Sequence, residues 1–350
     1  MYHALGDRDL DLTVSRQDED LEFLAGTNAD VAVAEIQENV KSEFKLARKI
    51  LKDEGFPDWQ SYNRLLYNWA FCVFTSRSFR PSLVIPPAAR ETIKAMLPPR
   101  CDLDDFSILQ PLFDIANHSI TAKYTWDVTS DPKSCQLICG DAYRPGEQVF
   151  NNYGLKTNSE LLLGYGFILP ETDSFHNDYV HVRARPQEDA PEDSEPKDFL
   201  ISLRPMADKS SLVGRERLPK PELSQFYLLP AFGHFEPSLI QDLSSQLSAP
   251  VDREILEASP DEVTWKKPPP GGLVELIKQM LSGKLGYDYQ KLKEADPLEV
   301  DEKTGEPREA LPKNQYQELA LAYRKQYEKV LVAAMRALGV PEGGDVQGGT

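Results

Sequence analysis

The sequence lacks the features that mark secreted, membrane-spanning or disulfide-stabilised proteins. No uninterrupted apolar stretch approaches the roughly 18 residues that a membrane span needs. The opening MYHALGDRDLDL has neither the basic nor the apolar region of a signal peptide. Four cysteines in 350 residues do not make a disulfide framework. These absences predict a globular intracellular protein, cytoplasmic or nuclear or both.

The signatures of common enzyme classes are missing as well. The chain has no G-x-S-x-G, no H-E-x-x-H, no Walker A motif and no G-x-G-x-x-G after a strand. Its five histidines are dispersed, and its cysteines form no C-x-x-C pair. Cys135 and Cys139 are four apart on a predicted strand and so share a face, which would supply half a metal site. No other pair completes it, so we expect two small core residues and no bound metal.

Positive charge is scarce. Lysine and arginine number 39 against 56 aspartates and glutamates, which gives a net charge of −17. An acidic chain repels phosphate backbones, so general nucleic-acid binding is not expected. A partner with a basic surface is favoured, although solubility alone would also explain the sign.

The composition divides the chain into helical and strand-rich regions, without an internal repeat. Apolar residues at helical spacing predict one helix over 31–54 and a second from a cap at Asp58 to about residue 76. Short apolar runs and turn dipeptides predict strands over 101–185. Residues 186–198 are rich in proline and acid, as in a solvated linker. A further amphipathic helix is predicted over 315–337.

Three segments carry the candidate chemistry. They are Pro111-Leu-Phe-Asp-Ile-Ala-Asn117-His118-Ser119, Pro145-Gly-Glu-Gln-Val-Phe-Asn-Asn-Tyr153-Gly154 and Asn158-Ser-Glu-Leu-Leu-Leu-Gly-Tyr165-Gly-Phe167. Taken singly, each has an ordinary structural interpretation: a turn, a turn feeding a strand, and core packing around a close backbone approach. Their order and spacing carry more information than any one of them.

Together the segments resemble the C-terminal half of a SET domain. The closest branch is that of the Rubisco large-subunit methyltransferase-like proteins, which includes fungal ribosomal-protein lysine methyltransferases and actin-histidine methyltransferases. Thr75-Ser-Arg-Ser-Phe79 and Glu22-Phe-Leu-Ala-Gly-Thr-Asn28 match the same branch.

The resemblance implies an α+β fold. It would consist of a β-rich SET (β-clip) core with a helical insert, followed by a mainly α-helical C-terminal domain. The implied domains are a remnant of the SET domain with its insert over 1–100 and the C-terminal half of the SET domain over 101–185. An acidic linker over 186–199, a helical substrate-binding domain over 200–340 and a disordered tail over 341–350 follow.

The resemblance also implies S-adenosylmethionine (SAM) as cofactor. Asn117 and His118 match the pair that contacts its amino-acid and adenine portions. Arg77 matches the arginine that helps to hold its carboxylate, and Phe167 the aromatic residue that stacks on adenine. Tyr153 matches the catalytic tyrosine, which lies at the methyl-transfer channel beside the cofactor.

On the substrate side, Asp114 and Tyr165 match residues that line the pocket for the substrate side chain. Methyl transfer to an amine needs a neutral nucleophile, and deprotonating a lysine at pH 7 costs roughly 4 to 5 kcal/mol. An apolar channel disfavours the ammonium form, and an aromatic face favours the positive charge on sulfur. His118 as a general base, or as a histidine satisfied within the core, is the alternative reading of that residue.

The sequence departs from the family at its beginning. Members start with a SET-N half whose Gly-x-Gly turn cradles the methionine part of SAM, and the first 20 residues here contain no such turn. We therefore expect a SET domain truncated at its N-terminus, with weak SAM binding and slow turnover. The cysteine-rich zinc-binding tail of histone-type SET enzymes is also missing, as this branch implies.

The function expected is a SAM-dependent protein-lysine N-methyltransferase. Its substrate would be a basic, non-histone, ribosomal-protein-like protein, with histidine as the alternative target. The rival hypothesis is a catalytically impaired SET fragment that acts as a protein-binding module. Neither nucleic acid nor membrane is expected as a partner, and the sequence does not indicate the oligomeric state.

Overall fold

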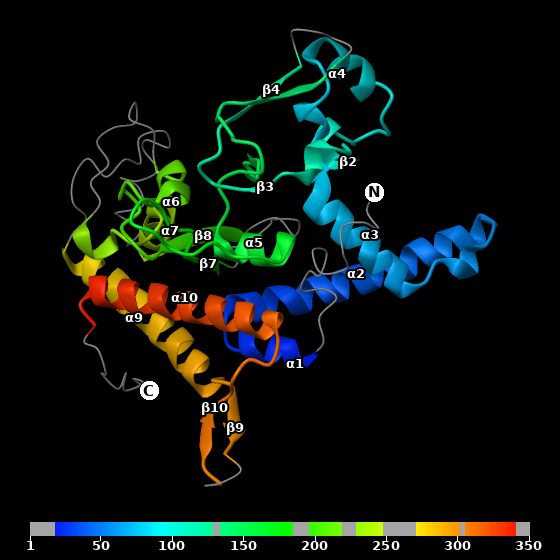
Figure 1. Cartoon of the computed structure of the whole chain (residues 1–350). Helices are drawn as coiled ribbons and strands as arrows, with labels where there is room; N and C mark the ends of the chain where they lie inside the picture. The colour runs from blue at the N-terminus through cyan, green and yellow to red at the C-terminus, as the bar shows by residue number, and fades with distance from the viewer. Residues whose placement is uncertain are drawn as a thin grey trace. The chain divides into compact units, whose positions relative to one another are not determined.

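The computed structural model describes residues 18–128, 134–184, 196–218, 229–247, 271–301 and 305–340 (Figure 1). The chain forms two units. Unit 1 comprises Met1–Ser15, Glu35–Lys156 and Gly164–Gly166, and unit 2 comprises Arg16–Ala34, Thr157–Leu163 and Phe167–Thr350. Helix and strand are mixed, so the predicted α+β class is confirmed.

Helices dominate the first part of unit 1. They are α2 (Asn28–Asp53), which begins in unit 2, α3 (Arg64–Arg77) and α4 (Pro87–Lys94). The predicted helix over 31–54 is confirmed, but Asp58 does not cap the second one. Asp58 has a left-handed backbone with φ 53° and precedes a 3-10 turn, Trp59–Ser61. The cap is Asn63, whose extended backbone lets its side chain accept from the Leu66 N–H at 2.9 Å.

The strands of unit 1 form separate two-stranded pairs. The antiparallel pairs are β1 (Ser78–Phe79) with β2 (Ile108–Leu109) and β4 (Tyr124–Asp127) with β5 (Gln136–Cys139). The parallel pair is β3 (Asn117–His118) with β6 (Phe150–Asn151). Strands over 101–185 are thus confirmed up to residue 151 and again at β7 (Tyr179–Ala184). It is wrong for 158–165, which form α5 (Asn158–Tyr165).

Cys139, the last residue of β5, and Cys135, just before the strand, are not core residues. Cys139 is exposed and Cys135 is half-buried, so the expectation of two small core residues is wrong. The reason is that β4 and β5 form a two-stranded ribbon of their own, with Tyr124 opposite Cys139, and three of the four residues of β5 are exposed. Within the described residues, no group of three or more histidines, cysteines or acids has the arrangement of a metal site.

Unit 2 contains the large apolar core. Its elements are α1 (Asp18–Leu21), β7 (Tyr179–Ala184), β8 (Lys197–Ser202), α6 (Leu212–Glu216), α7 (Pro237–Leu247), α9 (Gly271–Glu294) and α10 (Gln315–Leu338). The β7–β8 ribbon packs with α7, α9 and α10 around residues such as Phe235, Ile277 and Leu331, each fully buried. The predicted helix over 315–337 is α10, and its predicted apolar face is the one that is buried.

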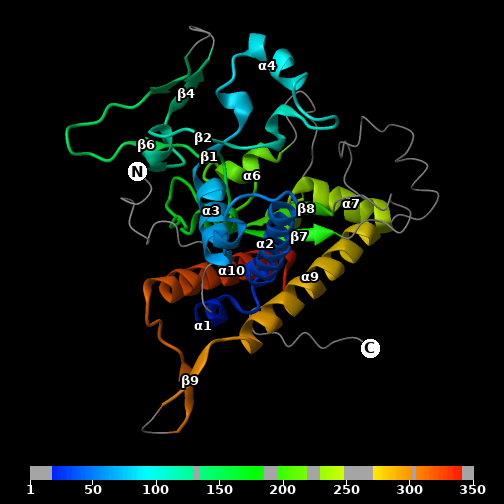
Figure 2. The same cartoon turned by 90° about the vertical axis from the view of Figure 1, so that its right-hand side faces the viewer.

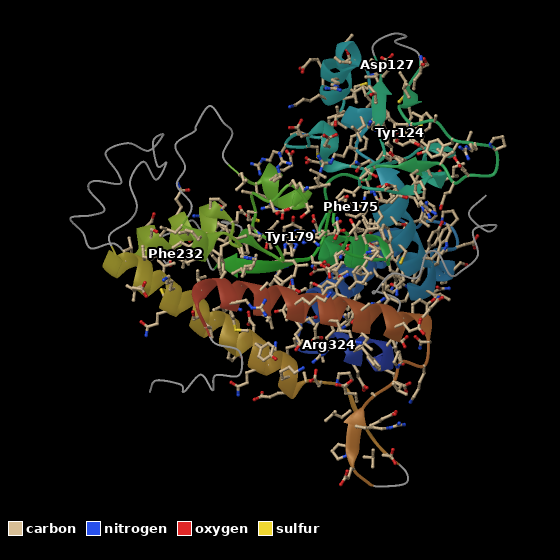
Figure 3. The ribbon with its side chains drawn as sticks, turned by 60° about the vertical axis from the view of Figure 1, so that its left-hand side comes forward. Tyr124, Asp127, Phe175, Tyr179, Phe232 and Arg324 are labelled. Carbon is tan, nitrogen blue, oxygen red and sulfur yellow. The ribbon has the colours of Figure 1, made fainter. Side chains whose placement is uncertain are left out.

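The N-terminal segment of unit 2 is fixed against the ends of two helices. Gly26 has φ +80° and approaches α9 so closely that a Cβ would lie 2.9 Å from the Lys291 carbonyl oxygen. Arg324 of α10, labelled in Figure 3 and 3% exposed, donates to the carbonyls of Ala25 and Leu292 and forms an ion pair with Asp296 at 2.8 Å. The buried guanidinium and the close approach at the glycine therefore help to fix the segment Glu22–Asn28, together with the core packing of Phe23 and Leu24.

Residues between α9 and α10 form a β-ribbon rather than a loop. The strands β9 (Leu298–Val300) and β10 (Pro307–Glu309) pair antiparallel after the end of α9 (Figures 1 and 2). Arg308 of β10 lies 2.7 Å from the Glu299 carboxylate of β9. One cross-strand pair of opposite charges thus supports the ribbon.

The two units do not follow the domain boundaries expected from sequence. The chain passes between the units at several points, among them 156–157, and β8 begins at Lys197, inside the expected linker over 186–199. β7 and β8 pair along six residues each, which joins the two sides of that linker in one ribbon. Residues 186–195 and the expected tail over 341–350 lie outside the described residues. No described helix combines the length and the apolar character that crossing a membrane requires.

Candidate functional site

The β3–β6 pair brings two of the three motif segments together in unit 1. Asn117 lies opposite Phe150 and His118 opposite Asn151. Beyond the strands, the Ser119 N–H donates to the Asn151 carbonyl at 2.8 Å, and the Asn152 side-chain amide donates to the Ile120 carbonyl at 3.0 Å. Backbone and side-chain hydrogen bonds thus hold the Asn-His segment against the segment that leads to Tyr153.

His118 is buried and held in one tautomer. Its Nδ1 accepts the Tyr153 backbone N–H at 3.0 Å, so the proton of the neutral ring is on Nε2. The pKa of His118 is lowered to about 4, mainly by burial and next by the nearby Lys156 charge, with the Asn151 backbone acting in the opposite direction. The imidazole is therefore neutral at physiological pH.

Tyr153 lies between two other rings. Its ring centroid is 5.1 Å from that of His118 and 5.0 Å from that of Tyr165. Its hydroxyl donates to the Ala116 carbonyl at 2.8 Å. Burial raises the Tyr153 pKa, the Arg77 charge opposes that rise and the Asp114 charge adds to it. The net shift is upward, so the phenol keeps its proton.

Arg77 and Asp114 meet beside this row. Arg77 is the last residue of α3, and its Nη1 donates to the Asp114 carbonyl at 2.6 Å. Its Nε is buried and has no hydrogen-bond partner among the residues that the structure describes. The buried Asp114 carboxylate accepts from the N–H of Leu112 at 3.1 Å. Leu112 has φ +85°, a left-handed conformation that its side chain disfavours.

The structure thus gathers most of the predicted site residues in unit 1. Arg77, Asp114, His118, Tyr153 and Tyr165 are linked by the contacts above. Asn117 precedes His118 on β3 and is exposed. Phe167 belongs to unit 2, so its position is given within that unit alone, where it is half-buried.

Two contributors to the site were not predicted from sequence. One is the Ala116 carbonyl, the acceptor for Tyr153; main-chain groups carry no sequence signal. The other is Lys156, whose Nζ lies 5.7 Å from the centroid of the Tyr165 ring. A cation three residues after the motif tyrosine could have been noted in the sequence, but only the fold places it on an aromatic face.

A separate cavity of about 530 Å³ lies in unit 2. Gly26 and Asn28, α5, the β7–β8 ribbon, α9 and Tyr327 of α10 line it. At the wall of this cavity both ring nitrogens of His181 are hydrogen-bonded. Nε2 lies 2.9 Å from the Thr157 hydroxyl, and Nδ1 lies 2.7 Å from the Asp198 carboxylate. None of the predicted site residues lines this cavity, so it is not the predicted site.

Of three curated relatives of the chain, two are methyltransferases by name, and the third is named for its SET domain. The ribosomal lysine N-methyltransferase set10 of Schizosaccharomyces pombe is 35% identical over 43% of this chain and 24% of its own length. The Rubisco large-subunit N-methyltransferase of Pisum sativum is 29% identical over 52% of this chain and 38% of its own. SET domain-containing protein 4 of Homo sapiens is 30% identical over 43% and 27%. The chain thus spans well under half the length of these relatives, and no protein-family model matches it.

Solved structures extend the likeness over nearly the whole chain. Rubisco LSMT bound to AdoMet matches with a TM-score of 0.58 and 16% identity, over 97% of this chain and 69% of that one. The LSMT SET domain bound to lysine and AdoHcy matches with a TM-score of 0.54 over 94% and 67%. The chain therefore has the α+β fold of Rubisco LSMT, and its homologues are SET-domain lysine methyltransferases, which confirms the family resemblance of its motifs.

Proposed function

We propose that this chain binds SAM and takes part in methylating lysine side chains of a protein substrate. The observation that carries the proposal is the row of rings formed by His118, Tyr153 and Tyr165, with Arg77 and Asp114 beside it. The names of the curated relatives and the ligands of the similar structures support the same chemistry.

Arg77 is suited to bind the carboxylate of the cofactor. A guanidinium presents five donors in a planar fork that matches a carboxylate. Nη1 of Arg77 is used by the Asp114 carbonyl, whereas its buried Nε has no partner among the described residues. A buried donor without an acceptor is costly, so an anionic ligand at Arg77 would satisfy it.

SAM supplies a methyl group on a positively charged sulfur. The part of this chain is to orient the amine and to exclude water. The Tyr153 hydroxyl donates its hydrogen bond to the Ala116 carbonyl, so its oxygen lone pairs remain available as acceptors for polarised C–H or N–H groups. The flanking faces of His118 and Tyr165 make the channel aromatic, which favours positive charge.

The geometry argues against His118 as general base. A neutral imidazole has one acceptor nitrogen, and in His118 that nitrogen already accepts the Tyr153 N–H. Taking a proton from the substrate would break this hydrogen bond and place a charge in a buried site, which the low pKa of His118 opposes. The role in holding the cofactor, which the resemblance implies, is compatible with the observed tautomer.

We propose a basic, ribosomal-protein-like substrate. Two curated relatives are named as ribosomal lysine methyltransferases, and the net charge of −17 would attract a basic partner.

Two variants of the chain separate binding from transfer. Radiolabelled SAM at up to millimolar concentration would be used in equilibrium dialysis and in transfer to a ribosomal-protein fraction. Arg77→Met should weaken SAM binding by about 10- to 100-fold, because a charge-assisted hydrogen bond is lost. Tyr153→Phe should leave binding within about threefold and lower the transfer rate by on the order of 10²–10³.

Arg80→Met is the matched control, since Arg80 is exposed and lies three residues beyond Arg77. It should behave as the unchanged chain. Transfer that is equally fast in Tyr153→Phe would refute the catalytic assignment, and binding that is unaffected by Arg77→Met would refute the cofactor assignment.

A further inference from the structure

The part of α2 that belongs to unit 1 carries positive charge on one face (Figures 1 and 2). Successive residues of an α-helix are separated by about 100° around its axis. On that geometry one arc of about 100° holds the side chains that we call the basic stripe, Lys45, Arg48, Lys49 and Lys52. The three lysines are exposed and Arg48 is half-buried. The stripe therefore presents its charges to solvent along about two turns of helix, or roughly 10 Å.

Neighbouring acids do not pair with the stripe. Among the residues that the structure describes, none of its four side chains forms an ion pair. Lys41, one turn earlier, does pair with Glu38 at 2.6 Å, and Lys45 acts on Glu38 only from further away, as a smaller contribution than Lys41 to its lowered pKa. Glu43 lies on the opposite side of the helix, where its carboxylate accepts from the Tyr67 hydroxyl at 3.3 Å. The cations from Lys45 onward thus remain available to an external anion.

Trp59 supports two of these cations. The guanidinium carbon of Arg48 lies 5.3 Å from the centroid of the Trp59 ring, and Nζ of Lys52 lies 5.7 Å from it. Arg48 also lies 6.0 Å from the centroid of the Phe44 ring. An aromatic face attracts a cation without neutralising its charge. Both side chains are therefore held in place, which reduces the entropy that they lose when an anion binds.

The composition of the stripe favours nucleic acid over protein as its partner. Lysine is depleted at protein–protein interfaces, whose centres are apolar, whereas interfaces with nucleic acid are strongly positive. The exposed apolar residues Leu46 and Ile50 of α2 lie outside the arc, so the stripe has no apolar centre. Its length of roughly 10 Å corresponds to about three phosphates of one strand.

We infer that the basic stripe of α2 binds the phosphate backbone of nucleic acid, without regard to base sequence. The inference goes beyond the proposed function and does not depend on it, because no residue of the stripe belongs to the row of rings. The net charge of −17 opposes nucleic-acid binding by the surface as a whole. Exposed charges more than about 10 Å away are screened at 0.1 M salt, so the stripe acts through its own cations.

The test measures the fluorescence anisotropy of a labelled oligo(U) RNA with the full chain, from about 50 to 200 mM salt. The variant combines Lys45→Gln with Lys49→Gln, because these two exposed side chains make no contact with Trp59. Its affinity at the lowest salt should fall by about 10-fold or more. The slope of log K against log salt should become shallower by about 1.4, which is 0.7 for each lost contact to a single strand.

The matched control combines Lys123→Gln with Lys325→Gln, which removes the same formal charge at two exposed positions outside the stripe. Both its affinity and its slope should equal those of the unchanged chain. An oligo(dT) of the same length should bind the unchanged chain about as tightly as the oligo(U), because both present the same backbone. A tenfold or larger preference for either one would contradict recognition through phosphates alone.

Other results would overturn the inference. One is equal binding of the oligo(U) by the stripe variant and the control variant. Another is a poly-glutamate peptide, or vesicles of phosphatidylserine, that competes with the oligo(U) as effectively as unlabelled oligo(U) does; the stripe would then be a site for acidic protein or for lipid. If the double variant does not fold, Lys49→Gln alone must reduce the slope by about 0.7, and Lys45→Arg with Lys49→Arg must bind as the unchanged chain does.

Discussion

Burial changes the charge state of individual carboxyl groups in unit 2. Asp178 is 2% exposed, and burial raises its pKa to about 6. Its Oδ1 accepts from the Asn158 side chain at 2.8 Å, whereas its Oδ2 is buried without a hydrogen-bond partner among the described residues. One oxygen is thus satisfied and the other is not, so ionisation of this group in the folded chain is unfavourable.

Asp178 should make stability fall as the pH rises. Its pKa in the folded chain is above the ordinary value for an aspartate, 3.8, so the folded state binds more protons between about pH 4 and pH 6. The stabilisation is present at low pH and is lost as the pH rises through 6. The asparagine in Asp178→Asn does not ionise, so the variant does not lose this stabilisation. The free energy of unfolding of the variant, minus that of the unchanged chain, should therefore increase by about 1 to 2 kcal/mol from pH 4 to pH 8.

Urea unfolding followed by circular dichroism at pH 4, 6 and 8 would measure that difference. Asp208→Asn is a suitable control, because Asp208 lies in the same unit and its side chain has the opposite shift, a lowered pKa from its hydrogen bonds to Ser210. A difference for Asp178→Asn that is the same at all three pH values would contradict the assignment.

At the scale of elements, caps decide where helices begin. Asn314 caps α10 by accepting the N–H groups of Tyr316 and Gln317, each at 2.9 Å. The side-chain amide of Asn314 also donates to Asp20 at 2.8 Å. The cap therefore fixes the first turn of the helix whose inner face forms the core of unit 2.

Asn314→Ala should lower the free energy of unfolding of unit 2 by about 1 to 2 kcal/mol, because two amide groups lose their acceptor. Thermal melts at constant pH would show the loss. Lys325→Ala, at an exposed position of the same helix, should change the free energy by less than about 0.5 kcal/mol. Equal effects of the two substitutions would mean that the cap contributes nothing specific.

At the scale of the molecule, apolar burial is unequal between the units. The buried apolar clusters of the described residues all belong to unit 2. Unit 1 instead exposes large apolar side chains, such as Leu65 at 79% and Met96 at 80%. Its strands are two to four residues long and paired only in twos. Such pairs have little independent stability in water.

We therefore expect unit 1 to open at a lower free energy than unit 2. Native-state hydrogen exchange should show amides of β1 to β6 exchanging at least 10-fold faster than those of β7, β8 and α10, because few apolar contacts oppose opening in unit 1. Mass spectrometry of peptides from the exchanged chain would resolve the two groups. Exchange at one common rate throughout would show that the chain opens as a single unit.

The sequence by itself determined the long helices and the order of the motifs. The helices 31–54 and 315–337 follow from apolar residues repeated every three to four positions, a local pattern that burial of one face then satisfies. The motif segments around His118, Tyr153 and Tyr165 predicted the family and most of the candidate site. Their contacts in unit 1 are consistent with that prediction.

Only the tertiary structure decided the features that depend on residues far apart in the chain. Two-residue strands such as β3 and β6 carry no periodic pattern, and their parallel pairing joins positions more than 30 residues apart. The tautomer of His118 follows from that pairing, because the Tyr153 N–H reaches the His118 ring only once β6 lies against β3. Asp58 failed as a cap for a related reason: a capping side chain needs an extended backbone, and the chain supplies that conformation at Asn63.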